Sequence, residues 1–350
     1  MSSSSSTDAL GSSSPTRGAL LDLALRIRQS AREALGAALA RGRMDEIARP
    51  VAEGSGDVTY GLDLGAERAV REWSEEQARE GPLSVLTEDS GWRHLGPGPG
   101  GVVELPDFDH GGPRLAVDPI DGTRHLMYDL RSAWTVLSAA GPGAGQPTLA
   151  DVRQGIVAEI PDSRAARLRV VEASRGAGAS LTICDVESGA TVASQPLRAD
   201  ADDRPDHGYF TFFSFHPALR PDVARIAARF FARIERDEGA DPSACYDDQL
   251  ISSAGQLMQL AFGVYRMVLE ARELVARRRG VATQTAKPYD MAGAILCARE
   301  AGCVVTGPRS EPLDFPIDTK TPVSFVGYAN PETARRLAPH LAAVLREELG

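Results

Sequence analysis

Two carboxylates, a glycine and a threonine lie close together in the segment Asp-Pro-Ile-Asp-Gly-Thr that starts at Asp118. The proline fixes φ, so Asp118 and Asp121 can point to one side and leave the Ile120 carbonyl as a further oxygen ligand. Gly122 lets the backbone approach a ligand closely, and N–H groups at Gly122 and Thr123 would face an anion if they open a helix. The segment could therefore hold a metal ion and a phosphate together. The alternative is an Asp-Gly reverse turn with solvated carboxylates.

Further acidic residues could complete such a site, because magnesium takes several hard oxygen ligands and two-metal phosphoryl chemistry requires several carboxylates in one cleft. Glu88 and Asp89 follow a short apolar segment, residues 83–86, that is typical of a buried strand. Asp290 directly precedes a predicted helix at residues 291–301, where its alternative role is an ordinary N-cap. The residue types favour a metal-dependent hydrolase if the fold brings these segments together.

The same segments resemble the signatures of the inositol monophosphatase family. Residues 118–123 are similar to its first signature, and Tyr289-Asp290 followed by small residues is similar to its second, which usually begins Trp-Asp. Three more segments match in the family's order: residues 57–63 its early Asp-x-Val-Thr-x-x-Asp element, residues 87–90 its Gly-Glu-Glu-Ser segment, and residues 173–179 its Gly-rich hairpin. The resemblance extends from about the first helix to the C-terminus.

The resemblance implies a role for each matching residue. The implied metal ligands are Glu88, Asp118, the Ile120 carbonyl, Asp121 and Asp290, which would hold two or three Mg²⁺ ions. Thr123 and Asp63, together with Glu88, would orient the attacking water, while Asp57 is expected to be a turn or capping residue. Lithium sensitivity and a homodimer are also implied, although no residue identifies a dimer face.

The segments expected to contact the substrate depart from the family pattern. Gly122 and Thr123 fit it, but Ser252-Ser253-Ala254 stands where the family commonly has Gly-Ser-x-Ala. The family often carries an acidic residue shortly before its second signature, and here residues 271–286 are inserted. Glu270 is either that substrate-contacting residue, displaced by the insertion, or part of a helix surface. The arginines at residues 277–279 could bind a second phosphate or form a solvated helix end.

The resemblance therefore implies a Mg²⁺-dependent phosphate monoester hydrolase that acts on a small sugar or inositol phosphate, with inositol 1-monophosphate as the first choice. Fructose 1,6-bisphosphate and 3′(2′),5′-bisphosphate nucleotides are the alternatives, because both are substrates in related families. An alternative of another class is a catalytically inactive relative that binds inositol phosphate or acts as a scaffold. The carboxylates present at every expected position argue against that alternative.

The elements that must position these residues alternate between helical and strand patterns. Helical spacing predicts helices at residues 17–43, 64–79, 248–262, 269–279, 291–301 and 331–349, and another after Pro217. Short apolar segments make the middle of the chain mostly sheet, whereas the Gly- and Pro-rich residues 96–112 predict a surface loop without regular structure. This order indicates layered α and β structure.

The resemblance makes the fold more specific: a layered α/β/α/β/α sandwich of the sugar phosphatase type. It would consist of an N-terminal α+β half, residues 17–205, and a C-terminal α/β half, residues 206–350, with the metal site between them. The Ser-rich residues 1–16 are expected to be a disordered tail.

Composition and charge exclude several other classes. A chain of 350 residues with 43% hydrophobic content can bury a substantial core. Its formal net charge of −10 argues against a nucleic-acid polymer as partner. No apolar run approaches the roughly 20 residues needed to span a membrane, and no secretory signal is recognisable. The four cysteines are scattered, which fits thiols in a reducing cytoplasm.

Overall fold

The computed structural model describes residues 15–53 and 58–350, whose strands form three sheets. Asp57 and most of the Ser-rich segment lie outside the described residues. The smallest sheet pairs β1 (Pro50–Glu53) with β2 (Val58–Tyr60) in antiparallel fashion.

The largest sheet has nine strands in the order β11-β10-β9-β8-β7-β6-β3-β4-β5. Their bounds are β3 (Leu83–Thr87), β4 (Gly91–Gly98), β5 (Gly101–Glu104), β6 (Arg114–Asp121), β7 (Ala133–Ala140), β8 (Val152–Ile160), β9 (Arg167–Ser174), β10 (Gly178–Asp185) and β11 (Thr191–Leu197). Neighbouring strands are antiparallel except β3 and β6, which run parallel. Because parallel strands end at the same edge of a sheet, the residues that follow β3 lie beside the end of β6.

The third sheet has five strands in the order β13-β12-β14-β16-β15. Their bounds are β12 (Tyr209–Phe212), β13 (Tyr246–Asp247), β14 (Tyr265–Glu270), β15 (Val304–Thr306) and β16 (Phe325–Tyr328). All strands of the large sheet precede residue 198 and all strands of this sheet follow residue 208. A domain boundary between the two sheets, near residues 204–207, stays a prediction.

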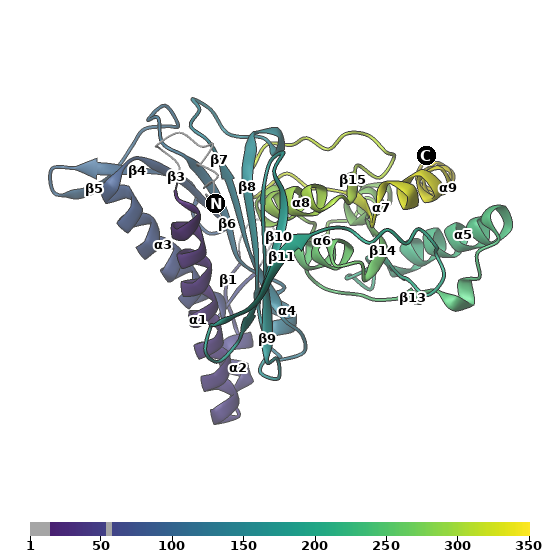
Figure 1. The fold of residues 1–350 in the computed structure, drawn as a ribbon, viewed down its shortest axis with the longest axis horizontal. Helices are drawn as coiled ribbons and strands as arrows, with labels where there is room; N and C mark the ends of the chain where they lie inside the picture. Colours follow the sequence, from purple (N-terminus) through teal and green to yellow (C-terminus); the bar gives the residue numbers. More distant parts are fainter. Residues whose placement is uncertain (1–14, 54–57) are drawn as a thin grey trace, which may run out of the picture.

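Helices cover both sheets and separate them (Figure 1). The outer layers are α1 (Arg17–Arg41) and α3 (Asp63–Glu80) on the large sheet, and α5 (Arg220–Glu238), α7 (Arg272–Arg279) and α9 (Pro331–Leu349) on the small one. Between the sheets lie α6 (Ser253–Ala261) and α8 (Pro288–Ala301). Short elements complete the set: α2 (Met44–Ala48), α4 (Thr123–Leu126), η1 (Leu149–Asp151) and η2 (Pro242–Ala244). The expected α/β/α/β/α layering is confirmed.

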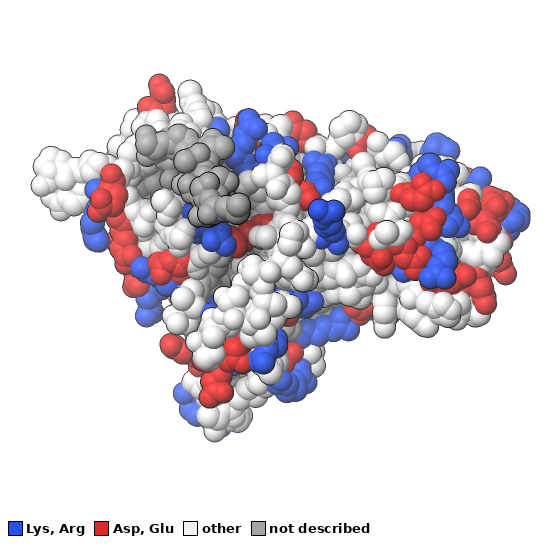
Figure 2. All heavy atoms as spheres, in the orientation of Figure 1, with Lys and Arg blue, Asp and Glu red and all other residues white. Residues whose placement is uncertain are grey.

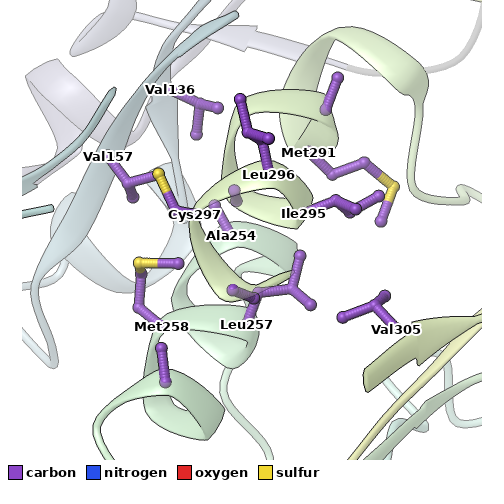
Figure 3. Close-up of a cluster of buried hydrophobic side chains, with 14 of the residues drawn as sticks. Val136, Val157, Ala254, Leu257, Met258, Met291, Ile295, Leu296, Cys297 and Val305 are labelled. Carbon is purple, nitrogen blue, oxygen red and sulfur yellow. The ribbon is translucent and has the colours of Figure 1, made fainter. Parts of the chain in front are cut away.

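The central layer carries the largest hydrophobic cluster. Leu257 and Met258 of α6 and Ile295 of α8 pack together with side chains from both sheets (Figure 3). The middle of α8, residues 291–298, is apolar and buried on all sides, as expected of a helix between two sheets. It lies very close to the large sheet, since a Cβ added at Gly293 would come within 2.4 Å of the Leu137 carbonyl. This packing fixes the first turn of α8, which carries Asp290.

Three predicted helices begin or end elsewhere in the structure. The helix predicted at residues 291–301 starts three residues earlier, at a proline, which suits the first helical position. The helix predicted at residues 248–262 starts only at Ser253. The pattern at residues 269–279 combines the end of β14 with α7, and Ala271 separates the two.

The prediction of an irregular loop at residues 96–112 is wrong in its first part, where β4 and β5 form a hairpin. Proline is tolerated on strands that lack a neighbour on one side. Pro97 pairs with Val102 of β5, beyond the last residue of β4 that pairs with β3. The missing proline N–H therefore leaves no gap in the ladder between β3 and β4.

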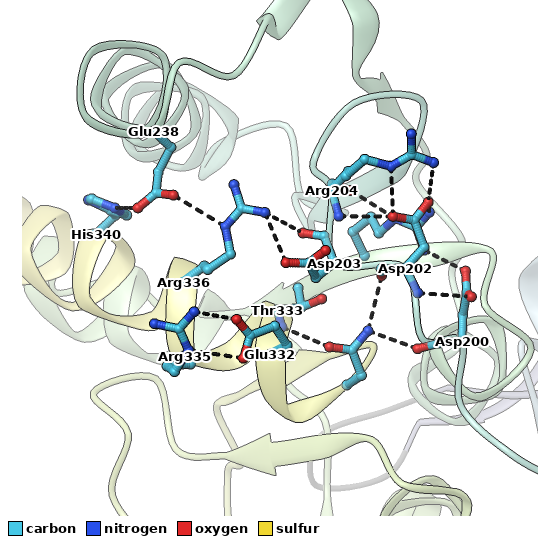
Figure 4. A network of polar contacts seen from close by, with 12 residues as sticks. Asp200, Asp202, Asp203, Arg204, Glu238, Glu332, Thr333, Arg335, Arg336 and His340 are labelled. Carbon is cyan, nitrogen blue, oxygen red and sulfur yellow. Dashed lines mark hydrogen bonds and ion pairs between the residues drawn. The ribbon is translucent and has the colours of Figure 1, made fainter.

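Ion pairs hold the segment between the two larger sheets against the C-terminal half. Arg266 of β14 contacts Asp200 at 2.8 Å and Asp202 at 2.9 Å. Arg336 of α9 lies 3.1 Å from Asp203 and 3.2 Å from Glu238 (Figure 4). The Arg266 side chain is only 8% exposed. Its contacts therefore fix the chain between β11 and β12 against β14.

The surface carries both signs of charge. Basic and acidic side chains are interspersed on the face shown in Figure 2, most densely over α5 and α9. Within the described residues, no helix combines the length and apolar character that crossing a membrane requires.

Candidate active site

One cleft collects side chains from both halves of the chain and encloses about 880 Å³, part of it open to solvent. A volume of this size suits a small-molecule ligand. Most of the predicted site residues line it, namely Asp63, Glu88, Asp118, Ile120, Asp121, Gly122, Thr123, Ser252, Ser253 and Asp290. Ala254 and Glu270 do not line the cleft.

The parallel pairing of β3 and β6 brings the first two acidic segments together. Leu86 pairs with Ala116, so continuing the register sets Glu88 beside Asp118. Glu88 is half-buried in the turn after β3, whereas Asp118 is only 8% exposed and accepts a 3.0 Å hydrogen bond from the Ile120 N–H. Two carboxylates therefore meet at one edge of the sheet.

A bulge in β6 explains how Asp118 and Asp121 reach the same cleft. In a regular strand, residues three apart point to opposite faces. Here Asp118 pairs with Val136 and Asp121 with Trp134, so β6 has one residue more than β7 between these pairs. The extra residue reverses the alternation and brings both carboxylates to the same side.

Asp63 and Thr123 come together as the resemblance implies. The Thr123 Oγ1 lies 3.1 Å from the Asp63 Oδ1 and 2.8 Å from the Ile120 carbonyl. Asp63, the first residue of α3, also accepts a 2.8 Å hydrogen bond from the Tyr60 N–H. The hydroxyl is thus held between a carboxylate and a predicted ligand carbonyl.

Gly122 permits the tight turn that leads into α4. Its φ of 102° lies in the left-handed region, and a Cβ there would come within 3.3 Å of Ile251 and Ser252. α4 itself is a single turn of four residues. The expected helix does begin at Thr123, but few peptide dipoles are aligned in so short a helix. The contact of its N-terminus with a phosphate stays a prediction.

The N-terminus of α6 holds Asp121 in place. Its Oδ2 accepts hydrogen bonds from the Ser252 hydroxyl at 2.7 Å and from the Ala254 N–H at 2.6 Å. Burial raises the pKa of Asp121 to about 6, and these hydrogen bonds oppose the increase. Ala254 is fully buried and contributes its backbone to Asp121, so its expected contact with substrate is not supported by its position. Substrate contact by Ser252 and Ser253 stays a prediction.

Asp290 enters the cleft from the first turn of α8. It occupies the third helical position, and its Oδ2 accepts a 3.0 Å hydrogen bond from the Lys287 N–H. The N-cap residue is Lys287, so the N-cap alternative for Asp290 is wrong. The carboxylate still caps the helix from within and lines the cleft.

The electrostatics of the cleft indicate a position for cations. Burial raises the pKa of Asp118 well above its usual range, and the nearby carboxylates of Asp121, Asp290 and Glu88 raise it further. Carboxylate and carbonyl oxygens are the ligands that Mg²⁺ prefers, so the donor set fits a divalent cation. Within the described part of the chain, no three His, Cys, Asp or Glu side chains already surround one ion position.

Glu67 lines the same cleft and was missed in the sequence. Its pKa is raised to about 8, first by burial and then by the charges of Asp89, Asp63 and Glu88. A signal was present, because Glu67 follows Asp63 by four residues and such residues share one face of a helix.

The insertion contributes to the cleft in an unexpected way. Glu270 is 1% exposed and forms an ion pair with Arg272 at 2.7 Å. Arg272 lines the cleft and Glu270 does not, so the position of Glu270 does not support its predicted contact with substrate. The alternative of a helix surface is wrong, because Glu270 is the buried last residue of β14. The arginines at residues 277–279 are exposed and do not line the cleft.

Comparisons with known proteins agree with this architecture. A model of the inositol monophosphatase family matches residues 26–348, and no curated protein matches the chain. The structure is similar to the extragenic suppressor protein suhB from Bartonella henselae, at 16% identity and a TM-score of 0.60, over 93% of this chain and 97% of that one. It is also similar to an inositol monophosphatase–fructose 1,6-bisphosphatase, at 14% identity and a TM-score of 0.62, over 93% and 99% of the two chains.

A third similar structure is inositol monophosphatase II from Staphylococcus aureus with inositol monophosphate bound, at 16% identity and a TM-score of 0.55, over 95% and 98% of the chains. A complex of that protein with 2′AMP is known as well. At these identities, the likeness shows a common fold.

Proposed function

The chain belongs to the inositol monophosphatase family, and we propose on this premise that its cleft hydrolyses small phosphate monoesters with the help of Mg²⁺. The observation that carries the proposal is the convergence of Glu88, Asp118, Asp121 and Asp290, from both halves of the chain, in one cleft of ligand size. Glu88 follows β3, Asp118 and Asp121 belong to β6, and Asp290 lies in the first turn of α8, so their meeting depends on the complete fold. Buried carboxylates without a cation repel one another, as the raised pKa of Asp118 indicates.

Five groups would hold two or three Mg²⁺ ions: the carboxylates of Glu88, Asp118, Asp121 and Asp290 and the Ile120 carbonyl. When bound, Mg²⁺ lowers the pKa of a water ligand and neutralises charge on the phosphoryl oxygens. Asp63 orients the Thr123 hydroxyl, which would hold the attacking water by a hydrogen bond. Phosphate monoester hydrolysis depends mainly on such positioning and charge neutralisation, so no protein nucleophile is needed.

The substrate class is a small sugar or inositol phosphate, with inositol 1-monophosphate as the first substrate to test. The inositol monophosphate complex of the Staphylococcus aureus protein supports this choice. Fructose 1,6-bisphosphate and a 3′(2′),5′-bisphosphate nucleotide follow, supported by the inositol monophosphatase–fructose 1,6-bisphosphatase and the 2′AMP complex.

The proposal is tested by phosphate release from a panel of these esters, with and without Mg²⁺, for the wild type and for Asp118→Asn. We expect release that requires Mg²⁺ and falls at least about a hundredfold in the variant, because the substitution removes an ionised ligand. Equal activity of both proteins would contradict the metal mechanism. Absence of release from every ester would instead favour the inactive, ligand-binding relative.

Lithium sensitivity, a homodimer and a cytoplasmic location complete the proposal. Inhibition of the same reaction by millimolar lithium tests the first, and light scattering of the purified protein tests the second. The cytoplasm is supported by the four cysteines, which are all free thiols in the structure.

A further inference from the structure

The insertion at residues 271–286 forms one wall of the cleft. Its first turn contributes Arg272, and its end contributes Gln284, Thr285 and Ala286. This wall faces the site that the metal-ligand carboxylates share, so a phosphate ester held by those carboxylates would extend toward it. Its side chains are therefore placed to select the substrate.

Arg272 is held rigidly in this wall. Its Nε lies 2.9 Å from both carboxylate oxygens of Glu270, and its Nη2 lies 2.7 Å from one of them. The guanidinium also stacks over the Phe213 ring, 4.6 Å from its centroid. The Arg272 side chain is only 8% exposed. A guanidinium fixed on two sides loses little further entropy when it binds a ligand.

One edge of this guanidinium remains for a ligand. Glu270 occupies the edge formed by Nε and Nη2, and no residue among those that the structure describes accepts a hydrogen bond from Nη1. Thr285, in the same wall, has a buried hydroxyl that likewise lacks a partner within the described chain. Buried polar groups normally have partners, so the Thr285 hydroxyl, beside the open edge of Arg272 in the same wall, indicates that a polar ligand completes this wall.

The chemistry of the free edge favours an anion. Two N–H groups in one plane match the two oxygens of a phosphate or carboxylate, and such charge-assisted pairs are about twice as strong as neutral ones. A neutral polyol hydroxyl would use only one of them. Arg124 lines the cleft nearby and contacts Gln284 at 3.1 Å, which adds positive charge beside the wall.

We infer that Arg272 determines specificity by binding a second anionic group of the substrate. This inference rests on the proposed phosphatase function and narrows its substrate class to phosphate esters that carry another phosphate or a carboxylate. The expected contact of an acidic residue with ring hydroxyls is thus replaced by contact of a cation with an anion.

The test compares matched substrates that differ only in the second group. Fructose 1,6-bisphosphate against fructose 1-phosphate tests a phosphate, and 3-phosphoglycerate against glycerol 3-phosphate tests a carboxylate. We expect the wild type to prefer one of the two esters that carry a second anionic group. The preference should be on the order of tenfold to a hundredfold in kcat/KM, mainly through KM. Arg272→Gln should lower that preference at least about tenfold.

Two further variants keep the test decisive. Glu270→Gln/Arg272→Gln removes both charges together, so no buried carboxylate is left unpaired, and its thermal unfolding checks that the fold is kept. Arg278→Gln alters an exposed arginine of the same helix and should leave the preference unchanged.

Each outcome decides one point. Equal rates on both members of each wild-type pair would overturn the inference and leave the phosphatase function intact. An equal loss on both members in the Arg272 variants would mean that Arg272 binds the reacting phosphate, which also overturns it. A lost preference in Arg278→Gln would assign the second anion to the exposed arginines instead. No phosphate release from any ester would contradict the proposed function itself.

Discussion

Glu67 is a half-buried carboxyl near the charges of Asp89, Asp63 and Glu88, and its protonation should affect the stability of the metal-free protein. Its pKa is raised from 4.5 to about 8 in the fold. Between these two values the unfolded chain releases the proton while the folded chain keeps it. The free energy of unfolding therefore falls as pH rises from about 4.5 to 8, by a few kcal/mol at most.

Glu67→Gln cannot ionise, so the variant should lack this part of the pH dependence. In EDTA we expect its thermal unfolding temperature to change less between pH 5 and 8 than that of the wild type, and to exceed it at pH 8. Glu72→Gln, which alters an exposed residue of the same helix, is the control and should follow the wild type. Parallel curves for Glu67→Gln and the wild type would refute this role.

For single residues, the sequence identifies charged side chains of the site more readily than the ion pairs that they form. Asp118, Asp121 and Asp290 were recognised as a group because each stands in a short signature, and the structure brings them to one cleft. Arg272 could not be recognised, because its proposed role depends on its ion pair with Glu270, the last residue of β14, and the sequence does not show that pair. Sequence distance alone does not reveal which member of such a pair faces the ligand.

Among the elements, α6 has a double connection to the site through Ser252. The Ser252 hydroxyl caps the helix by accepting a 2.8 Å hydrogen bond from the Gly255 N–H, and it also donates to Asp121. Ser252→Ala should therefore lower the free energy of unfolding by about 2 kcal/mol, the sum of a lost cap and a lost buried hydrogen bond. It should also weaken Mg²⁺ binding, because the pKa of Asp121 rises further without this donor.

Ser253→Ala is a matched control for this prediction. Ser253 lines the cleft at the next position but does not cap the helix. Urea unfolding of the two variants should give a clear loss for Ser252→Ala and a smaller one for Ser253→Ala. Equal losses would show that the cap and the Asp121 contact contribute nothing specific.

Helices with one buried face were predicted correctly from the spacing of their apolar residues. The prediction failed for strands whose structure depends on pairing with a neighbouring strand. The spacing in α1 and α9 reflects one buried face each, which sequence periodicity reports directly. The hairpin of β4 and β5 contradicts its Gly- and Pro-rich composition, because an edge position tolerates residues that a central strand would not. The bulge in β6 likewise depends on its pairing with β7.

For the whole molecule, the cleft lies where the two halves of the chain meet. Asp118 belongs to the large sheet and Asp290 to the helix between the sheets. Their mutual repulsion opposes this contact when no cation is present. Bound Mg²⁺ would convert the repulsion into attraction, so metal binding should stabilise the complete fold as one cooperative unit.

Protons and Mg²⁺ should compete for these carboxylates, which makes the stabilisation by metal depend on pH. Burial raises the pKa of Asp121 to about 6, so protonated Asp121 is common at pH 5.5 and rare at pH 8. In EDTA, stability should fall as pH rises through this range, because the unfolded chain ionises first. The increase in unfolding temperature caused by saturating Mg²⁺ should thus be larger at pH 8 than at pH 5.5.

Proton release on Mg²⁺ binding is a second measurement of this competition. Calorimetry in two buffers of different ionisation enthalpy should detect this release at pH 6, and the Asp118→Asn variant should release fewer protons. An increase that is the same at both pH values, without proton release, would place Mg²⁺ away from these carboxylates.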